Sequence, residues 1–170
     1  MTARLVDALD DRGIRDAHVM GYSHGGVVAQ QLARTAPATV RSLALVATYA
    51  HNTATPRERL EGWLMPHLVR LLGMRRLAAL VARPGTGGGP PLPPDRIAWM
   101  RGMLAELYIP TIVISGGDDT AVPARHAAML ATGIPGARTA VIADAGHTMV
   151  WTHPDRLRRD TRRVVDRVES

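Results

Sequence analysis

The 170-residue sequence predicts an α/β fold with a sheet of about four mainly parallel strands, flanking helices and a helical insertion. Short apolar runs rich in β-branched residues alternate with stretches of helical periodicity, which is typical of βαβ units. One long segment interrupts this alternation with helical patterns alone. Apolar residues make up 46% of the chain, enough for one domain with a sizeable core.

The first fifty residues are expected to contain two helices and two strands. In chain order these are a helix at 2–12, a strand at 17–20, a helix at 24–36 and a strand at 40–47. Gly13 ends the first helix and Pro37 ends the second. Residues 40–47 are a continuous run rich in Leu and β-branched residues, which indicates a strand covered on both faces.

The last sixty residues repeat the alternation of strand and helix. The expected elements are a strand at 110–115, a helix at 123–132, a strand at 139–142 and a helix at 154–168. Gly133 ends the helix between the two strands. The final helix places Leu157 and Val164 on one apolar stripe and its arginines off that stripe, so it is expected to cover the sheet.

The segment between these two parts carries no strand signal. Its helical pieces lie at 56–65, 66–72, 74–82 and 94–107, with a Pro- and Gly-rich stretch at 83–94. A connection of this length is too long for an ordinary loop. We therefore expect residues 1–50 and 108–170 to form the core and residues 51–107 to form a helical insertion.

Composition excludes several classes of function. The net charge is +6, but every basic residue is Arg, as in a GC-rich coding sequence, and aromatics are only 4%. Nucleic-acid binding is therefore not expected. The chain has no cysteine, which excludes disulfides, thiolate chemistry and the common zinc sites. No apolar run approaches a membrane span and no signal peptide is visible at residues 1–13, so a cytoplasmic protein is expected.

The sequence Gly-Tyr-Ser-His-Gly at 21–25 matches the G-x-S-x-G pattern between an expected strand and an expected helix. This context favours a nucleophile elbow, a strained turn that holds the Ser23 hydroxyl clear of the backbone between two crowded glycines. The N-terminus of the following helix offers the His24 backbone N–H to an oxyanion. The alternative, a phosphate-binding glycine turn, lacks a G-x-G-x-x-G spacing or a Walker lysine.

Candidate acid and base residues follow the two later strands. Asp118 and Asp119 come after the strand at 110–115, and His147 comes after the strand at 139–142. Ligands and catalytic groups gather at the carboxyl ends of the strands in open α/β sheets. A serine nucleophile needs a base, and the base needs an acid that fixes its tautomer. The order Ser, Asp, His fits this requirement.

Three motifs together make the chain resemble the C-terminal two-thirds of an α/β-hydrolase. They are Gly-Tyr-Ser-His-Gly-Gly at 21–26, Gly-x-x-Asp-x-x-x-Pro at 116–123 and Gly-His with a later Pro at 146–154. The resemblance implies a partial α/β-hydrolase sheet, with the helical insertion as the family's cap. It also implies a serine hydrolase that cleaves an ester, lactone or similar small acyl substrate without a metal or organic cofactor.

The resemblance assigns roles to individual residues. Ser23 would be the nucleophile, His147 the base, and Asp119 the acid, because the family's acid lies three residues after the glycine. Tyr22, next to the nucleophile, is a candidate for the substrate pocket. Trp63 and Met100 are more typical of a cap core, and they are also candidates for the roof of an acyl pocket.

The resemblance also leaves a gap in the expected fold. The strands that flank 17–20 in the family, and the loop that supplies a second oxyanion donor, have no counterpart in the sequence. A bare strand edge is a template for pairing with another chain. We therefore expect self-association through this edge and weak turnover by the chain alone. The alternative function is a non-catalytic, hydrolase-like domain that only packs against a partner.

Overall fold

The computed structural model describes residues 2–50 and 94–170. Most of the predicted helical insertion, including Trp63, lies outside these residues. The described elements are α1 (Thr2–Asp10), β1 (Ala17–Tyr22), α2 (His24–Thr35), the 3-10 turn η1 (Pro37–Thr39), β2 (Val40–Val46), α5 (Pro94–Ala105), β3 (Thr111–Gly116), α6 (Ala124–Gly133), β4 (Arg138–Ile142), α7 (Met149–Thr152) and α8 (Pro154–Glu169).

The four described strands form one parallel sheet in the order β1-β2-β3-β4, as the sequence predicts. Met20 is in register with Ala44, and Leu45 with Val113. Because all four strands run in the same direction, their carboxyl ends lie at one edge of the sheet. The strand expected at 17–20 continues through Tyr22, which pairs with Val46.

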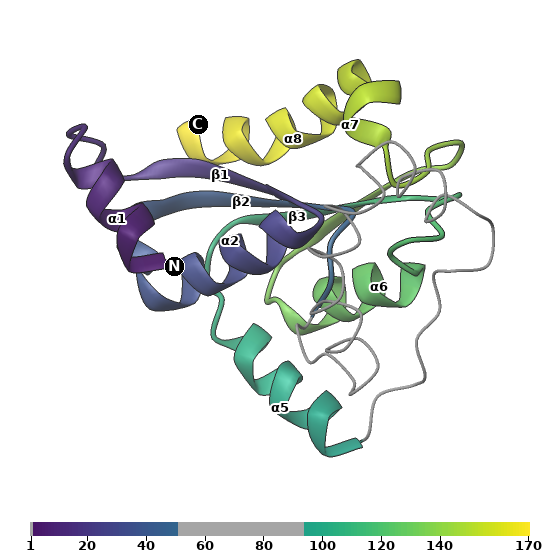
Figure 1. Cartoon of the computed structure of the whole chain (residues 1–170), viewed down its shortest axis with the longest axis horizontal. Helices are drawn as coiled ribbons and strands as arrows, with labels where there is room; N and C mark the ends of the chain where they lie inside the picture. Colours follow the sequence, from purple (N-terminus) through teal and green to yellow (C-terminus); the bar gives the residue numbers. More distant parts are fainter. Residues whose placement is uncertain (1, 51–93) are drawn as a thin grey trace, which may run out of the picture.

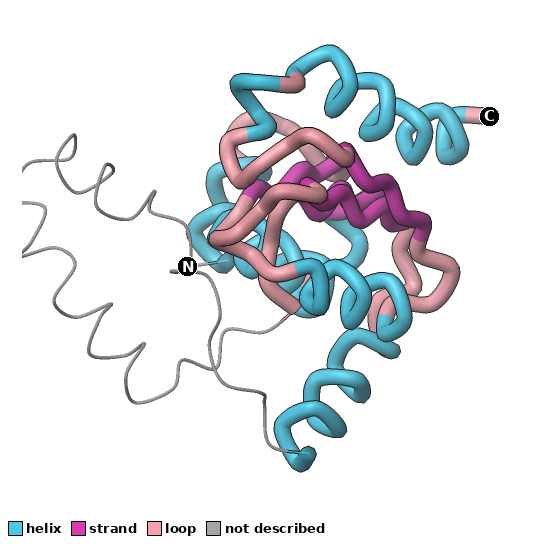
Figure 2. Tube along the Cα trace, turned by 90° about the vertical axis from the view of Figure 1, so that its right-hand side faces the viewer, coloured by secondary structure: helices cyan, strands magenta, loops and turns pink. Residues whose placement is uncertain are grey.

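Helices cover both faces of this sheet (Figures 1 and 2). Alternate residues of the buried central strands point to opposite faces, which explains why residues 43–46 and 112–114 are apolar at consecutive positions. One face packs against α2, α5 and α6, and the other against α8. The first core includes Leu32, Leu43, Leu45, Val113 and Leu130, and the second includes Val46, Ile114, Ile142, Leu157 and Val164.

Helix α5 is the described end of the predicted insertion. It packs beside α6, and its residue Leu104 is fully buried in the first core. A Cβ added to Gly133 would lie 2.6 Å from the Leu104 side chain, so the two helices approach closely there. This helix therefore belongs to a layer of the core. Met100 also lies on α5.

Strand β1 stands at one end of the described sheet and pairs with β2 alone among the described strands. The side chain of Met20 is 53% exposed on the face that α8 covers elsewhere. It lines a groove of about 510 Å³ together with residues of α7 and α8, including Val150, Leu157 and Val165. Apolar surface therefore borders the strand edge.

Self-association through this edge is expected to weaken when Met20 is replaced by Lys. A charge in the apolar groove penalises its burial against a second copy, and edge lysines oppose strand pairing. Light scattering behind size-exclusion chromatography measures the mass at several concentrations. Tyr108→Lys, at an 83% exposed site in a loop, is the control. A wild-type chain that stays monomeric at every concentration would contradict the prediction.

Among the described residues, no helix has the length and apolar character that a membrane span requires.

Candidate active site

Ser23 lies in the turn between β1 and α2, with φ 52° and ψ −124°. A positive φ is rare for a residue with a side chain, and such strain is common where function needs a fixed geometry. The Ser23 N–H donates to the Val46 carbonyl at 2.9 Å, and the Thr48 hydroxyl donates to the Ser23 carbonyl at 2.5 Å. Hydrogen bonds with the backbone of Val46, at the end of β2, and with the side chain of Thr48 just after it therefore hold the turn from both sides.

Two glycines allow β1 and α2 to approach each other at this turn. A Cβ on Gly21 would lie 2.5 Å from the Gly26 Cα, and a Cβ on Gly26 would lie 2.2 Å from the Thr48 hydroxyl oxygen. Gly25 was also expected to be crowded, and this expectation is wrong for the described part of the chain. Gly25 is exposed on α2, and an added Cβ meets no described atom within 4 Å.

The two neighbouring glycines of α2 are expected to respond in opposite ways to Ala. Gly26→Ala forces Thr48 away from Ser23 and should lower the free energy of unfolding by about 1–3 kcal/mol. Gly25→Ala meets open space and should leave it unchanged or raise it by up to about 1 kcal/mol through helix propensity. Urea denaturation of both variants measures the difference. Equal stabilities would contradict the close contact at Gly26.

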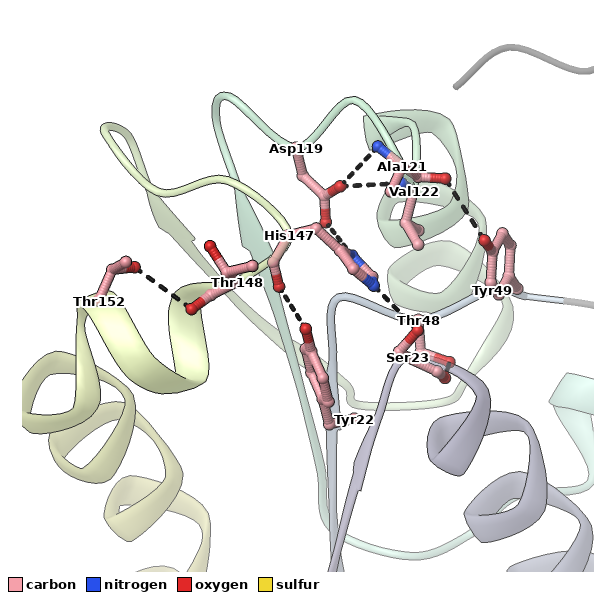
Figure 3. Close-up of polar contacts among 10 residues, drawn as sticks. All are labelled: Tyr22, Ser23, Thr48, Tyr49, Asp119, Ala121, Val122, His147, Thr148 and Thr152. Carbon is pink, nitrogen blue, oxygen red and sulfur yellow. Dashed lines mark hydrogen bonds and ion pairs between the residues drawn. The ribbon is translucent and has the colours of Figure 1, made fainter. Parts of the chain in front are cut away.

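The structure brings the three predicted catalytic residues together (Figure 3). The His147 Nε2 lies 3.0 Å from the Ser23 Oγ, and its Nδ1 lies 3.0 Å from the Asp119 Oδ2. The three side chains come from the turn after β1, the loop after β3 and the loop after β4. All three stand at the carboxyl edge of the sheet.

Asp119 is the most constrained of the three. Its side chain is 1% exposed, and its Oδ1 accepts the N–H groups of Ala121 and Val122, each at 2.9 Å. The Oδ2 is thereby directed at His147. The neighbouring Asp118 is exposed, so the structure places the acid chosen by the family spacing in the site.

The contact with Asp119 determines the tautomer of His147. A carboxylate only accepts hydrogen bonds, so the hydrogen-bond network assigns the ring proton to Nδ1. Nε2 is then the free acceptor that faces the Ser23 hydroxyl. The arrangement can therefore remove the hydroxyl proton and hold the resulting imidazolium next to a buried negative charge.

Tyr22 has a contact that the sequence did not indicate. Its hydroxyl donates to the His147 backbone carbonyl at 2.6 Å, and the two ring centroids lie 5.3 Å apart. Burial, and secondly the charge of Asp119, raise the pKa of Tyr22 above its usual value of 10. The hydroxyl therefore remains protonated at neutral pH and acts as a donor.

His24 is the first residue of α2, so its backbone N–H has no partner within the helix. The Gly26 N–H donates instead to the Ser23 carbonyl at 3.0 Å. The helix N-terminus thus presents the donor predicted from the sequence next to Ser23. The positive end of the helix dipole favours a negative charge there.

A second Asp–His contact joins Asp144 and His153 near this edge of the sheet, with 3.3 Å between the Asp144 Oδ2 and the His153 Nε2. The hydrogen bond from His153 lowers the pKa of Asp144, whose side chain is 83% exposed. This carboxylate is solvated. Within residues 2–50 and 94–170, no three or more His, Asp or Glu residues are grouped as a metal site requires.

Comparison with known proteins identifies relatives that match most of the chain. A sequence profile of the "Alpha/beta hydrolase family" matches residues 2–160. The poly(3-hydroxyalkanoate) depolymerase of Ectopseudomonas oleovorans is 30% identical over 182 residues, 91% of this chain and 62% of its own. A pimeloyl-[acyl-carrier protein] methyl ester esterase of Neisseria meningitidis is 27% identical over 168 residues, 82% of this chain and 65% of its own.

A solved structure has the same fold. The thermophilic esterase of Thermogutta terrifontis superposes with a TM-score of 0.78 at 20% identity, covering 98% of this chain and 71% of that one. The chain thus spans slightly under two-thirds of the length of the two sequence relatives and somewhat more of this structure.

Proposed function

Because the chain belongs to the alpha/beta hydrolase family, we propose that it is a serine hydrolase that cleaves a carboxylic ester, lactone or similar small acyl substrate. The observation that carries this proposal is the unbroken hydrogen-bond chain from Ser23 through His147 to Asp119. The name of one of these relatives, a methyl ester esterase, gives an ester as its substrate, which supports an ester as the substrate class of this chain.

Acylation begins when the Ser23 Oγ attacks the substrate carbonyl carbon. His147 Nε2 takes the hydroxyl proton as the new C–O bond forms, and Asp119 stabilises the imidazolium. His147 then gives this proton to the leaving alkoxide as the ester bond breaks. The products of this half are the alcohol and an acyl group on Ser23.

Deacylation repeats the same proton transfers with water. His147 takes a proton from the water that attacks the acyl carbonyl, and it returns that proton to the Ser23 oxygen as the acid leaves. In both halves the His24 N–H donates to the oxyanion of the tetrahedral intermediate. One such donor is worth about 100- to 1,000-fold in turnover.

Reaction with a fluorophosphonate probe tests the nucleophile without knowledge of the substrate. Such probes modify a serine whose hydroxyl an adjacent base activates. We expect the purified chain to gain one probe mass on the peptide that contains Ser23, and Ser23→Ala to gain none. Ser170→Ala, at the exposed end of α8, is the control and should label like the wild type. A folded chain that does not react would favour the non-catalytic alternative.

A further inference from the structure

Tyr22 connects β1 to the loop that carries the proposed base. Its hydroxyl reaches the backbone carbonyl of His147, 125 positions away in the sequence, at 2.6 Å (Figure 3). Its ring also contacts the His147 ring, with a tilt of 31° between the two planes. The same residue that precedes the nucleophile therefore contacts both the backbone and the ring of the base.

Among the described residues, backbone hydrogen bonds hold the loop both before and after His147. The Asp118 N–H donates to the Ala145 carbonyl at 3.0 Å, before His147. The Met149 N–H donates to the Gly146 carbonyl at 3.2 Å. The carbonyl of His147 itself is held by Tyr22. The His147 ring must stay 3.0 Å from both Ser23 and Asp119. Without the bond from Tyr22, the backbone carbonyl of His147 loses its hydrogen-bond donor.

Trp151 on α7 contributes to the placement of Tyr22. The Trp151 ring meets the Tyr22 ring edge-on, with centroids 6.0 Å apart. Aromatic rings prefer such edge-to-face arrangements. Tyr22 is therefore held by β1, by the His147 ring and by an aromatic contact from α7, so its hydroxyl has a defined direction.

We propose that Tyr22 is a positioning residue that fixes the backbone of His147, so that the imidazole stays aligned with Ser23 and Asp119. The proposal rests on the proposed function, in which His147 is the base. Tyr22, a candidate for the substrate pocket from the sequence, is thereby assigned a role in proton transfer. A displacement of about 1 Å of a catalytic group can reduce turnover about 100-fold.

The variant Tyr22→Phe removes the hydroxyl and retains the ring. We expect kcat for an activated ester to fall about 10- to 100-fold, while KM stays within twofold of wild type. The control is Tyr108→Phe, which removes a hydroxyl at an exposed loop position and should leave both constants unchanged. A rise in KM at unchanged kcat would overturn the proposal and assign Tyr22 to the substrate pocket. Unchanged values of both constants would also overturn it.

A second measurement keeps this proposal separate from the proposed function. The ¹³C resonance of the His147 carbonyl, in selectively labelled protein, should move when Tyr22→Phe removes its hydrogen-bond donor and stay in place in Tyr108→Phe. If the resonance moves while the wild type never reacts at Ser23, the contact exists and the proposed function fails. A resonance that does not move in a folded Tyr22→Phe variant would overturn the positioning role.

Discussion

Replacement of Asp119 by Asn is expected to lower kcat about 10,000-fold without unfolding the protein. The Asn side-chain carbonyl can still accept the N–H groups of Ala121 and Val122, which hold this loop. Its amide group then faces His147 and donates to Nδ1. The ring proton must move to Nε2, where it blocks transfer of the proton from Ser23. The wrong tautomer, and not a lost fold, therefore causes the loss.

The neighbouring carboxylate provides a matched control for this prediction. Asp118 is exposed, and its side chain is not part of the hydrogen-bond chain of the site. Asp118→Asn removes the same charge one residue away and should retain kcat within about twofold. Steady-state hydrolysis of an activated ester and thermal melting of both variants make the comparison. Equal losses in the two variants would show that charge near the site matters and that the Asp119–His147 contact does not.

Removal of the nucleophile and removal of the base are expected to be non-additive. Ser23 and His147 take part in the same proton transfer, so removal of either residue abolishes that step. Ser23→Ala and His147→Ala should therefore each lower kcat about a millionfold. The double variant should be no slower than either single variant. This outcome follows from the contact of 3.0 Å between the His147 Nε2 and the Ser23 Oγ.

The kinetic cycle of these four proteins measures the coupling directly. Residual hydrolysis must be corrected for the reaction in buffer, and Ser170→Ala controls for loss of a surface hydroxyl. Losses that multiply in the double variant would contradict a shared proton-transfer step. A single variant that retains wild-type kcat would remove that residue from the mechanism.

The sheet could be predicted from the sequence because its two central strands are buried on both faces. Residues 43–46 and 112–114 are apolar at consecutive positions, and such a short apolar run favours a strand over a helix. The end of β1 was predicted two residues too early. Gly21 resembles a turn residue, but the structure uses it as the point where β1 passes close to Gly26 of α2.

The three candidate catalytic residues were predictable because motif spacing and strand ends both mark them. The contacts that hold them were not, because they join residues distant in the sequence. Tyr22 stands beside the nucleophile in the motif, yet nothing in the sequence directs its hydroxyl to His147. Thr48 follows a core strand at the active edge, and this position is the signal that could have marked its contact with Ser23.

The most direct test is mass spectrometry of the chain after brief mixing with p-nitrophenyl acetate and quenching in acid. An acyl-enzyme mechanism predicts an acetyl group on the peptide that contains Ser23, formed together with p-nitrophenol and later lost to water. The His147→Ala variant should not accumulate it. Release of p-nitrophenol with no acetyl group on Ser23, or with the acetyl group on another residue, would contradict the mechanism.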